Sequence, residues 1–171
     1  MDRMFWGLAL LSSLSLRECS GHKAASSKEA PRPANLYLRI ERTPCYGRCP
    51  IDKVELFPDG KVRYEGQRFV PRLGVYTRQL SPQEQAQVEK TLREAHFEAY
   101  ADLYDNPGIS DLPSLILAYR LDGQEKQITC RTGCPPELPE KIEKLRELLV
   151  EKGSFQMEKG PGEEEKHEGD E

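Results

Sequence analysis

The chain has 171 residues, of which 37% are hydrophobic and 32% are charged, and its formal net charge is −4. This length indicates a single domain with a sizeable core. So small a charge does not indicate a nucleic-acid partner. No apolar run reaches the ~20 residues of a membrane-spanning helix, so we expect membrane contact only through a lipid anchor.

Residues 1–21 are similar to an export signal. A short apolar block covers residues 4–16, as in the hydrophobic region of a signal peptide. Leu16 stands three residues before Cys19, which resembles a bacterial lipoprotein signal in which Cys19 carries the lipid. Glu18 stands where that signal has a small residue, so a plain secretory signal is the alternative. We expect an exported protein, either periplasmic or an outer-membrane or cell-surface lipoprotein.

Residues 22–34 are predicted to be a polar linker, and residues 154–171 a disordered acidic tail. Residues 158–171 contain two lysines and seven acidic residues, a local charge of −5, so the chain before them sums to +1. Such a segment buries too little apolar surface to offset an ordering entropy of ~1–2 kcal/mol per residue. The folded domain is therefore expected within residues 35–153.

Period-2 alternation of apolar and polar residues predicts the strands, and apolar residues at helical spacing predict the helices. Strands are expected at residues 36–41, 53–56, 61–65, 74–80, 115–120 and 125–130. A capping box at Ser81 and Glu84 predicts a helix start, and a second helix is expected at residues 138–152. Residues 97–104 are expected to be irregular or briefly helical. The order ββββ-α-ββ-α predicts an α+β fold with an antiparallel sheet of about six strands and two helices on one face.

The chain contains two copies of Cys-x-x-x-Cys-Pro, each at the exit of a predicted strand. The copies contain Cys45 and Cys49, and Cys130 and Cys134. An exported chain with an even number of remaining cysteines favours disulfides, either within each loop or between the two loops. A four-thiolate zinc site and thiol redox chemistry are the alternatives.

The first of these copies lies in a wider pattern. The segments 44–50, 57–60 and 62–66 resemble the bacterial family called domain of unknown function 6438. The hallmark of that family is Cys-Tyr-Gly-x-Cys-Pro followed by a strand and a glycine-turn hairpin. The resemblance covers about residues 35–150. It implies an exported protein or lipoprotein and supplies no activity.

No catalytic residue is predicted. His96 is the only histidine between residues 35 and 153, and a surface or capping role is expected for it. Asp102, Asp105 and Asp111 are better explained as turn formers than as a calcium loop.

The candidate binding loop contains Tyr46, Arg48 and Arg131. Together with Arg39 and Arg42, the two arginines could gather as an anion site. We expect a non-enzymatic cell-envelope protein without a cofactor, whose cysteine-stapled domain binds an envelope protein or a small ligand. The alternative is a thiol-redox or zinc-binding protein that uses the four cysteines.

Overall fold

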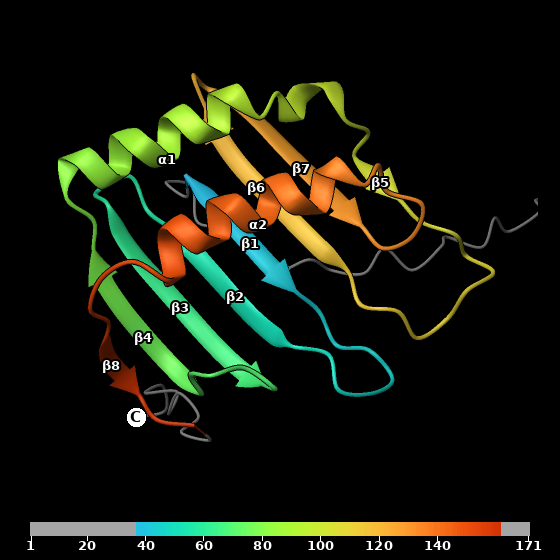
Figure 1. Cartoon of the computed structure of the whole chain (residues 1–171), viewed down its shortest axis with the longest axis horizontal. Coiled ribbons are helices and arrows are strands. Elements are labelled where there is room, and N and C mark those ends of the chain that lie inside the picture. Colours follow the sequence, from blue (N-terminus) through green and yellow to red (C-terminus); the bar gives the residue numbers. More distant parts are fainter. Residues whose placement is uncertain (1–36, 162–171) are drawn as a thin grey trace, which may run out of the picture. The chain divides into compact units, whose positions relative to one another are not determined.

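A computed structural model describes residues 37–161, which form one mixed sheet with two helices over one of its faces (Figure 1). In chain order the elements are β1 (Leu38–Arg42), β2 (Ile51–Leu56), β3 (Lys61–Arg68), β4 (Gly74–Gln79), α1 (Pro82–Glu94), the 3₁₀ helix η1 (Phe97–Ala99), β5 (Leu103–Tyr104), β6 (Leu115–Leu121), β7 (Gln124–Cys130), α2 (Glu137–Val150) and β8 (Gln156–Lys159). The predicted α+β class and the placement of both helices on one face are confirmed.

The sheet has eight strands rather than about six, in the order β5-β7-β6-β1-β2-β3-β4-β8. It is not wholly antiparallel, because β5 runs parallel to β7. The physical reason is the path of α1, which carries the chain from the β4 edge to the β7 edge (Figure 1). The chain then joins the sheet beside β7 and runs in the same direction. Two residues of backbone pairing carry too little pattern to be predicted as a strand.

Two tight turns form as the sequence predicts. Asp122 and Gly123 both have positive φ angles, of 52° and 77°, as the turn between two antiparallel strands requires. Gly60 closes the β2–β3 hairpin with a φ of 82°, and the Asp59 carboxylate accepts from the backbone N–H of Lys61 at 2.9 Å. These local contacts fix the pairing register of β2 with β3 and of β6 with β7.

The predicted capping box at the start of α1 is present. The Ser81 hydroxyl accepts from the backbone N–H of Glu84 at 3.3 Å, and the Glu84 carboxylate accepts from the backbone N–H of Ser81 at 2.8 Å. The backbone hydrogen bond from Ser81, with that from the Arg78 side chain, lowers the pKa of Glu84 to about 2. The cap therefore joins the helix start to the end of β4.

Ser81→Ala is expected to lower the free energy of unfolding by about 1 kcal/mol, because the helix loses one side-chain acceptor for its free N–H groups. Urea denaturation measures the change. Ser110→Ala is the matched control, since within residues 37–161 the Ser110 hydroxyl bonds only to the neighbouring Asp111 carboxylate on the surface. An equal loss in both variants would contradict a role for the cap.

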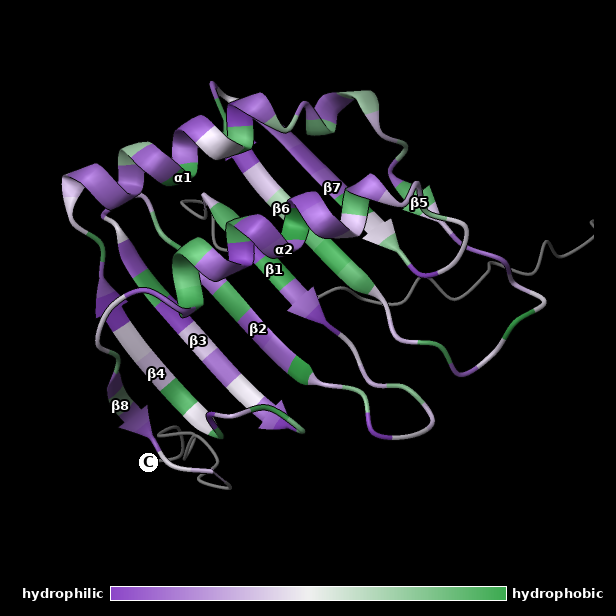
Figure 2. Cartoon of the chain, in the orientation of Figure 1, coloured by the Kyte–Doolittle hydropathy of each residue, from purple (hydrophilic) through white to green (hydrophobic). Residues whose placement is uncertain are grey.

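The hydrophobic core lies between the sheet and the two helices. Figure 2 shows apolar stretches of β1, β2 and β6 under α2, while the outer side of α1 is largely hydrophilic. The helices contribute residues at helical spacing that are fully or almost fully buried: Val88, Leu92, Leu138, Ile142, Leu145 and Leu149. Burial of this face, rather than helix propensity, stabilises the helices.

The opposite face of β2 and β3 carries a charged ladder. Lys53 lies 3.6 Å from the Glu65 carboxylate, and Arg63 lies 3.5 Å from Glu55 and 2.9 Å from Glu65. These positions alternate with the apolar residues that point toward the helices. The period-2 pattern therefore separates an apolar face from a charged one.

The segment after α2 differs from the prediction of disorder from residue 154 onward. Residues 156–159 form β8, which pairs with β4 and becomes the edge strand of the sheet. Phe155 anchors this segment, with its ring centroid 6.2 Å from that of Tyr64. The side chains of β8 are mostly exposed, so the strand is held by backbone pairing. Its sequence therefore has no apolar alternation from which a strand could be predicted. The predicted signal (1–21), the predicted linker (22–34), Cys19 and residues 162–171 lie outside the described residues.

Candidate apolar pocket at the disulfide end

Both cysteine pairs lie at one end of the sheet, in the β1–β2 loop and the loop after β7. The structure joins Cys45 to Cys49, with Cα atoms 5.9 Å apart, and Cys130 to Cys134, with Cα atoms 5.8 Å apart. Each disulfide thus closes its own loop. The two loops are not on neighbouring strands, because β6 lies between β1 and β7.

Hydrogen bonds tie the β1–β2 loop to the segment before β6. The backbone N–H of Thr43 donates to the Ser114 carbonyl at 3.0 Å, and the N–H of Ser114 donates to the Thr43 hydroxyl at 2.7 Å. The backbone N–H of Tyr46 donates to the carbonyl of Asp111 at 3.2 Å. With the disulfide, these bonds hold the loop in one position relative to β6.

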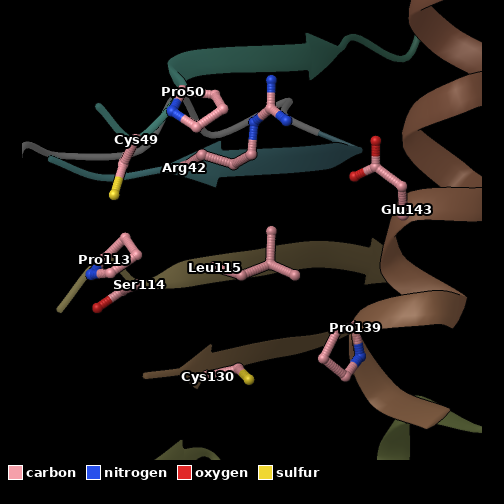
Figure 3. Close-up of a pocket in the computed structure, with 9 residues that line it drawn as sticks. All are labelled: Arg42, Cys49, Pro50, Pro113, Ser114, Leu115, Cys130, Pro139 and Glu143. Carbon is pink, nitrogen blue, oxygen red and sulfur yellow. The ribbon is translucent and has the colours of Figure 1, made fainter. Parts of the chain in front are cut away.

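A pocket of about 320 Å³ lies between these loops and α2 (Figure 3). Its lining comes from β1, β6, β7, α2 and the loops next to them: Arg42, Cys49, Pro50, Pro113, Ser114, Leu115, Cys130, Pro139 and Glu143. In Figure 3 the side chain of Leu115 lies between Arg42 and Cys130. Three prolines, one leucine and one cysteine from each disulfide make the walls mainly apolar and conformationally restricted.

The two charged residues of the lining are neutralised by partners beside the pocket. Arg42 makes a bidentate pair with Asp52, with Nε–Oδ1 and Nη2–Oδ2 distances of 2.6 and 2.5 Å. Glu143 accepts from Arg146 at 2.8 Å, and Arg146 also donates to Asp52 at 2.7 Å. The Tyr64 hydroxyl completes this polar cluster by donating to Asp52 at 3.1 Å. The cluster joins β1, β2, β3 and α2 behind the pocket.

Asp52 is ionised although only 3% of its surface is exposed. Burial alone would raise the pKa of this carboxyl, but the hydrogen bond from Arg42 and the charge of Arg146 outweigh burial and lower the pKa. Burial and the negative charge of Asp52 raise the pKa of Tyr64 to about 12. Asp52 therefore carries a fixed negative charge between two arginines, and Tyr64 stays protonated as a donor.

Asp52, Tyr64 and Arg146 were not predicted to be members of the site. Two signals in the sequence point to the cluster. Asp52 falls on the same side of β2 as Val54 and Leu56, and Arg146 follows Ile142 by four residues on the apolar face of α2. A charged residue on each of two apolar faces indicates a buried ion pair, because an unpaired buried charge is costly.

The three residues of the candidate binding loop have different surroundings. Tyr46 is 91% exposed. Arg131 pairs with Asp105 at 3.0 Å and donates to the Ile109 carbonyl at 2.9 Å. Arg48 lies over the ring of Phe69, with its guanidinium carbon 5.7 Å from the ring centroid.

The suggested cluster of four arginines does not form. Arg42 is occupied by Asp52, and Arg131 by Asp105. Arg39 lies 4.0 Å from Glu41 on β1. The cause is that each of these three side chains meets a carboxylate contributed by its own strand or by an adjacent one. Only Arg48 of the four keeps a guanidinium group without an acidic partner among residues 37–161.

The other candidate residues lie apart from the pocket lining. His96 is exposed, with its Nδ1 atom 3.1 Å from the Glu98 carboxylate. Asp102 pairs with Lys126 at 2.5 Å and Asp105 with Arg131, so these two acids are neutralised. Within residues 37–161 no group of three or more His, Cys, Asp or Glu side chains is placed to hold a metal ion.

The comparison with family models covers the disulfide end of the sheet and both helices. Residues 36–149 match the family described as Domain of unknown function (DUF6438). The chain belongs to this family. The DUF6438 match includes both disulfides, the pocket lining and the Asp52 cluster, and it ends before β8. No curated protein matches the chain.

The disulfides indicate a non-reducing environment such as exported proteins meet. Among the described helices, none is both long and apolar enough to cross a membrane.

Proposed function

We propose that this DUF6438 chain is a non-enzymatic, exported binding protein of the cell envelope. The proposal includes export to the periplasm or to the cell surface as a lipoprotein carrying lipid on Cys19. Two disulfides support export, because such bonds persist outside the reducing cytosol. The binding role rests on the pocket.

The apolar pocket between the disulfide loops is the observation that carries the binding role. Its volume of about 320 Å³ lies at the lower end of the range for ligand pockets, ~300–1,000 Å³. A water molecule occupies ~30 Å³, so the pocket has room for about ten groups of that size. Its charged lining residues, Arg42 and Glu143, are neutralised by Asp52 and Arg146. The ligand is therefore a small molecule or a side chain with an apolar part.

Binding of a neutral apolar probe to the full chain tests the proposal. We expect 1-octanol to shift the backbone amide resonances of Ser114, Leu115 and Cys130, which line the pocket. Leu115→Trp fills the pocket with a larger side chain and should abolish these shifts. Leu103→Trp is the matched control, because Leu103 is 62% exposed and is not part of the lining.

The outcome that contradicts the binding role is equally local. The binding role would be overturned if octanol shifted none of the lining residues of the wild-type chain. It would also be overturned if Leu115→Trp and Leu103→Trp lost the octanol shifts equally. Because the readout is residue-specific, contact of octanol with other parts of the full chain does not enter the result.

Thiol titration separates this function from the redox and zinc alternatives. We expect no free thiol from Cys45, Cys49, Cys130 or Cys134 in the native exported chain, and four after unfolding with reductant, because each pair is disulfide-bonded. Zinc should not bind before reduction, since the thiolate is the ligand form of cysteine. Four titratable thiols in the native chain, or one bound zinc ion, would favour the alternative.

A further inference from the structure

Two arginines, one in the β1–β2 loop and one at the end of β3, lack acidic partners within residues 37–161. The guanidinium carbons of Arg48 and Arg68 lie 5.7 and 5.1 Å from the centroid of the Phe69 ring. Among the residues that the structure describes, neither side chain makes an ion pair or a hydrogen bond. Most other arginines at this end, including Arg42 and Arg131, are neutralised by carboxylates. Arg48 and Arg68 are therefore unneutralised cations held on the same aromatic ring.

Contact with Phe69 orders these arginines without using their hydrogen-bond donors. A cation over an aromatic face is attracted by the ring, and a guanidinium group keeps its five N–H donors at its edges. Those donors match the geometry of a carboxylate or a phosphate, which they can bind in pairs. The pair Arg48 and Arg68 thus has the chemistry of an oxyanion subsite.

The backbone connects this subsite to one wall of the pocket, although neither arginine is part of the lining. Arg48 directly precedes Cys49, which lines the pocket and is fixed by its disulfide to Cys45. Arg68 pairs across the sheet with Ile51, the residue that follows the pocket-lining Pro50. Arg48 is therefore bonded directly to the wall that Cys49 and Pro50 form, and Arg68 lies on the strand paired with the residue that follows this wall.

We infer that Arg48 and Arg68 are the oxyanion subsite for the ligand of the apolar pocket, and that this ligand is an anionic amphiphile. Its apolar part occupies the pocket, and its carboxylate or phosphate group binds the two guanidinium groups. The inference rests on the proposed function and adds the chemical class of the ligand. A carboxylate and a phosphate share this chemistry, so the probes below include both.

Four probes on the full chain test the inference: octyl phosphate, octanoate, 1-octanol and inorganic phosphate. We expect octyl phosphate or octanoate to bind more tightly than octanol, and to shift the amides of Phe69 and Arg48 together with that of Leu115. The tighter of the two anionic probes identifies the headgroup. Inorganic phosphate should shift the amides of Phe69 and Arg48 alone.

The double variant Arg48→Gln with Arg68→Gln should weaken the binding of octyl phosphate and octanoate by at least about tenfold, because charged hydrogen bonds are lost. It should leave octanol binding unchanged. Lys90→Gln with Lys152→Gln is the matched control, since it removes the same charge from two exposed lysines outside the pocket lining. Thermal unfolding of both double variants should match that of the wild type, which shows that the fold is intact.

Each outcome distinguishes this inference from the proposed function. If octanol binds in the pocket but the anionic probes bind no more tightly than octanol, the oxyanion subsite is overturned and the pocket remains. The same conclusion follows if both double variants weaken the binding of the anionic probes equally. Absence of octanol shifts at Ser114, Leu115 and Cys130 overturns the pocket and with it the amphiphile. The inference is supported if the arginine double variant weakens the binding of the anionic probes and the lysine double variant does not.

Discussion

Asp52→Asn is expected to lower the free energy of unfolding by about 3–5 kcal/mol, since it leaves the buried Arg146 and the half-buried Arg42 without their negative partner. The Asp52 carboxylate accepts from Arg42, Arg146 and Tyr64 at 2.5–3.1 Å and is almost fully buried. An amide keeps the shape of the side chain but supplies no charge. Urea denaturation with near-ultraviolet circular dichroism measures the loss.

Asp122→Asn is the control for this variant. Asp122 pairs with Arg93 at 2.5 Å, but both side chains are largely exposed. Exposed ion pairs contribute ~0–1 kcal/mol, so this change should cost less than about 1 kcal/mol. Similar losses in the two variants would show that the Asp52 cluster does not stabilise the fold more than a surface pair.

The Asp52 cluster also predicts how stability depends on pH. The pKa of Asp52 is lower in the folded state than in the unfolded chain, where an aspartate titrates near ~3.9. Its stabilisation is therefore fully present above the unfolded pKa and is lost as the pH falls through the folded pKa. Asp52→Asn should show a shallower loss of stability in acid than the wild type. An unchanged slope would contradict an ionised Asp52.

The sequence predicted the elements whose causes are local. The capping box at Ser81, the turns at Gly60 and at Asp122–Gly123, and the alternation of β2 and β3 each depend on residues a few positions apart. Such features depend only on neighbouring residues, so the sequence of one segment is sufficient to predict them. The two disulfides also close loops with a sequence separation of 4, but the sequence left pairing within each loop and pairing between the loops as open alternatives.

The pocket and the polar cluster were not predictable in the same way. Asp52 and Arg146 are 94 residues apart, and Pro50, Pro113 and Pro139 meet only because β1, β2, β6 and α2 end at one place. The suggested cluster of four arginines could not be tested from the sequence for a related reason, since carboxylates on the same strand or on adjacent segments pair with three of them. Only the topology decides which charges meet.

The topology also bears on the proposed binding role of the disulfide end. A loop closed by a disulfide and tied by hydrogen bonds to Ser114 and Asp111 loses little conformational entropy when a ligand binds. The Asp52 cluster fixes the Arg42 and Glu143 side chains behind the pocket. Stability and binding are therefore linked at this end, so Asp52→Asn should also weaken octanol binding.

Phe97→Ala is expected to lower the free energy of unfolding by about 3–5 kcal/mol, because it removes a fully buried aromatic side chain from the core. The Phe97 ring centroid lies 6.2 Å from those of Tyr100 and Tyr119, and these contacts join η1 to β6. The cavity that is left cannot be filled by the two tyrosines without moving the strand that carries Tyr119. Urea denaturation measures the loss.

Phe69→Ala is the matched control, because Phe69 is 41% exposed and lies in the β3–β4 loop. It should cost about 1 kcal/mol or less, while releasing Arg48 and Arg68 from their common ring. Phe97→Ala should leave the binding of octyl phosphate to the remaining folded protein nearly unchanged, and Phe69→Ala should weaken it. Phe97→Ala should therefore have the larger effect on stability, and Phe69→Ala the larger effect on octyl phosphate binding, because the core and the oxyanion subsite are separate. If one variant had the larger effect in both measurements, that separation would be contradicted.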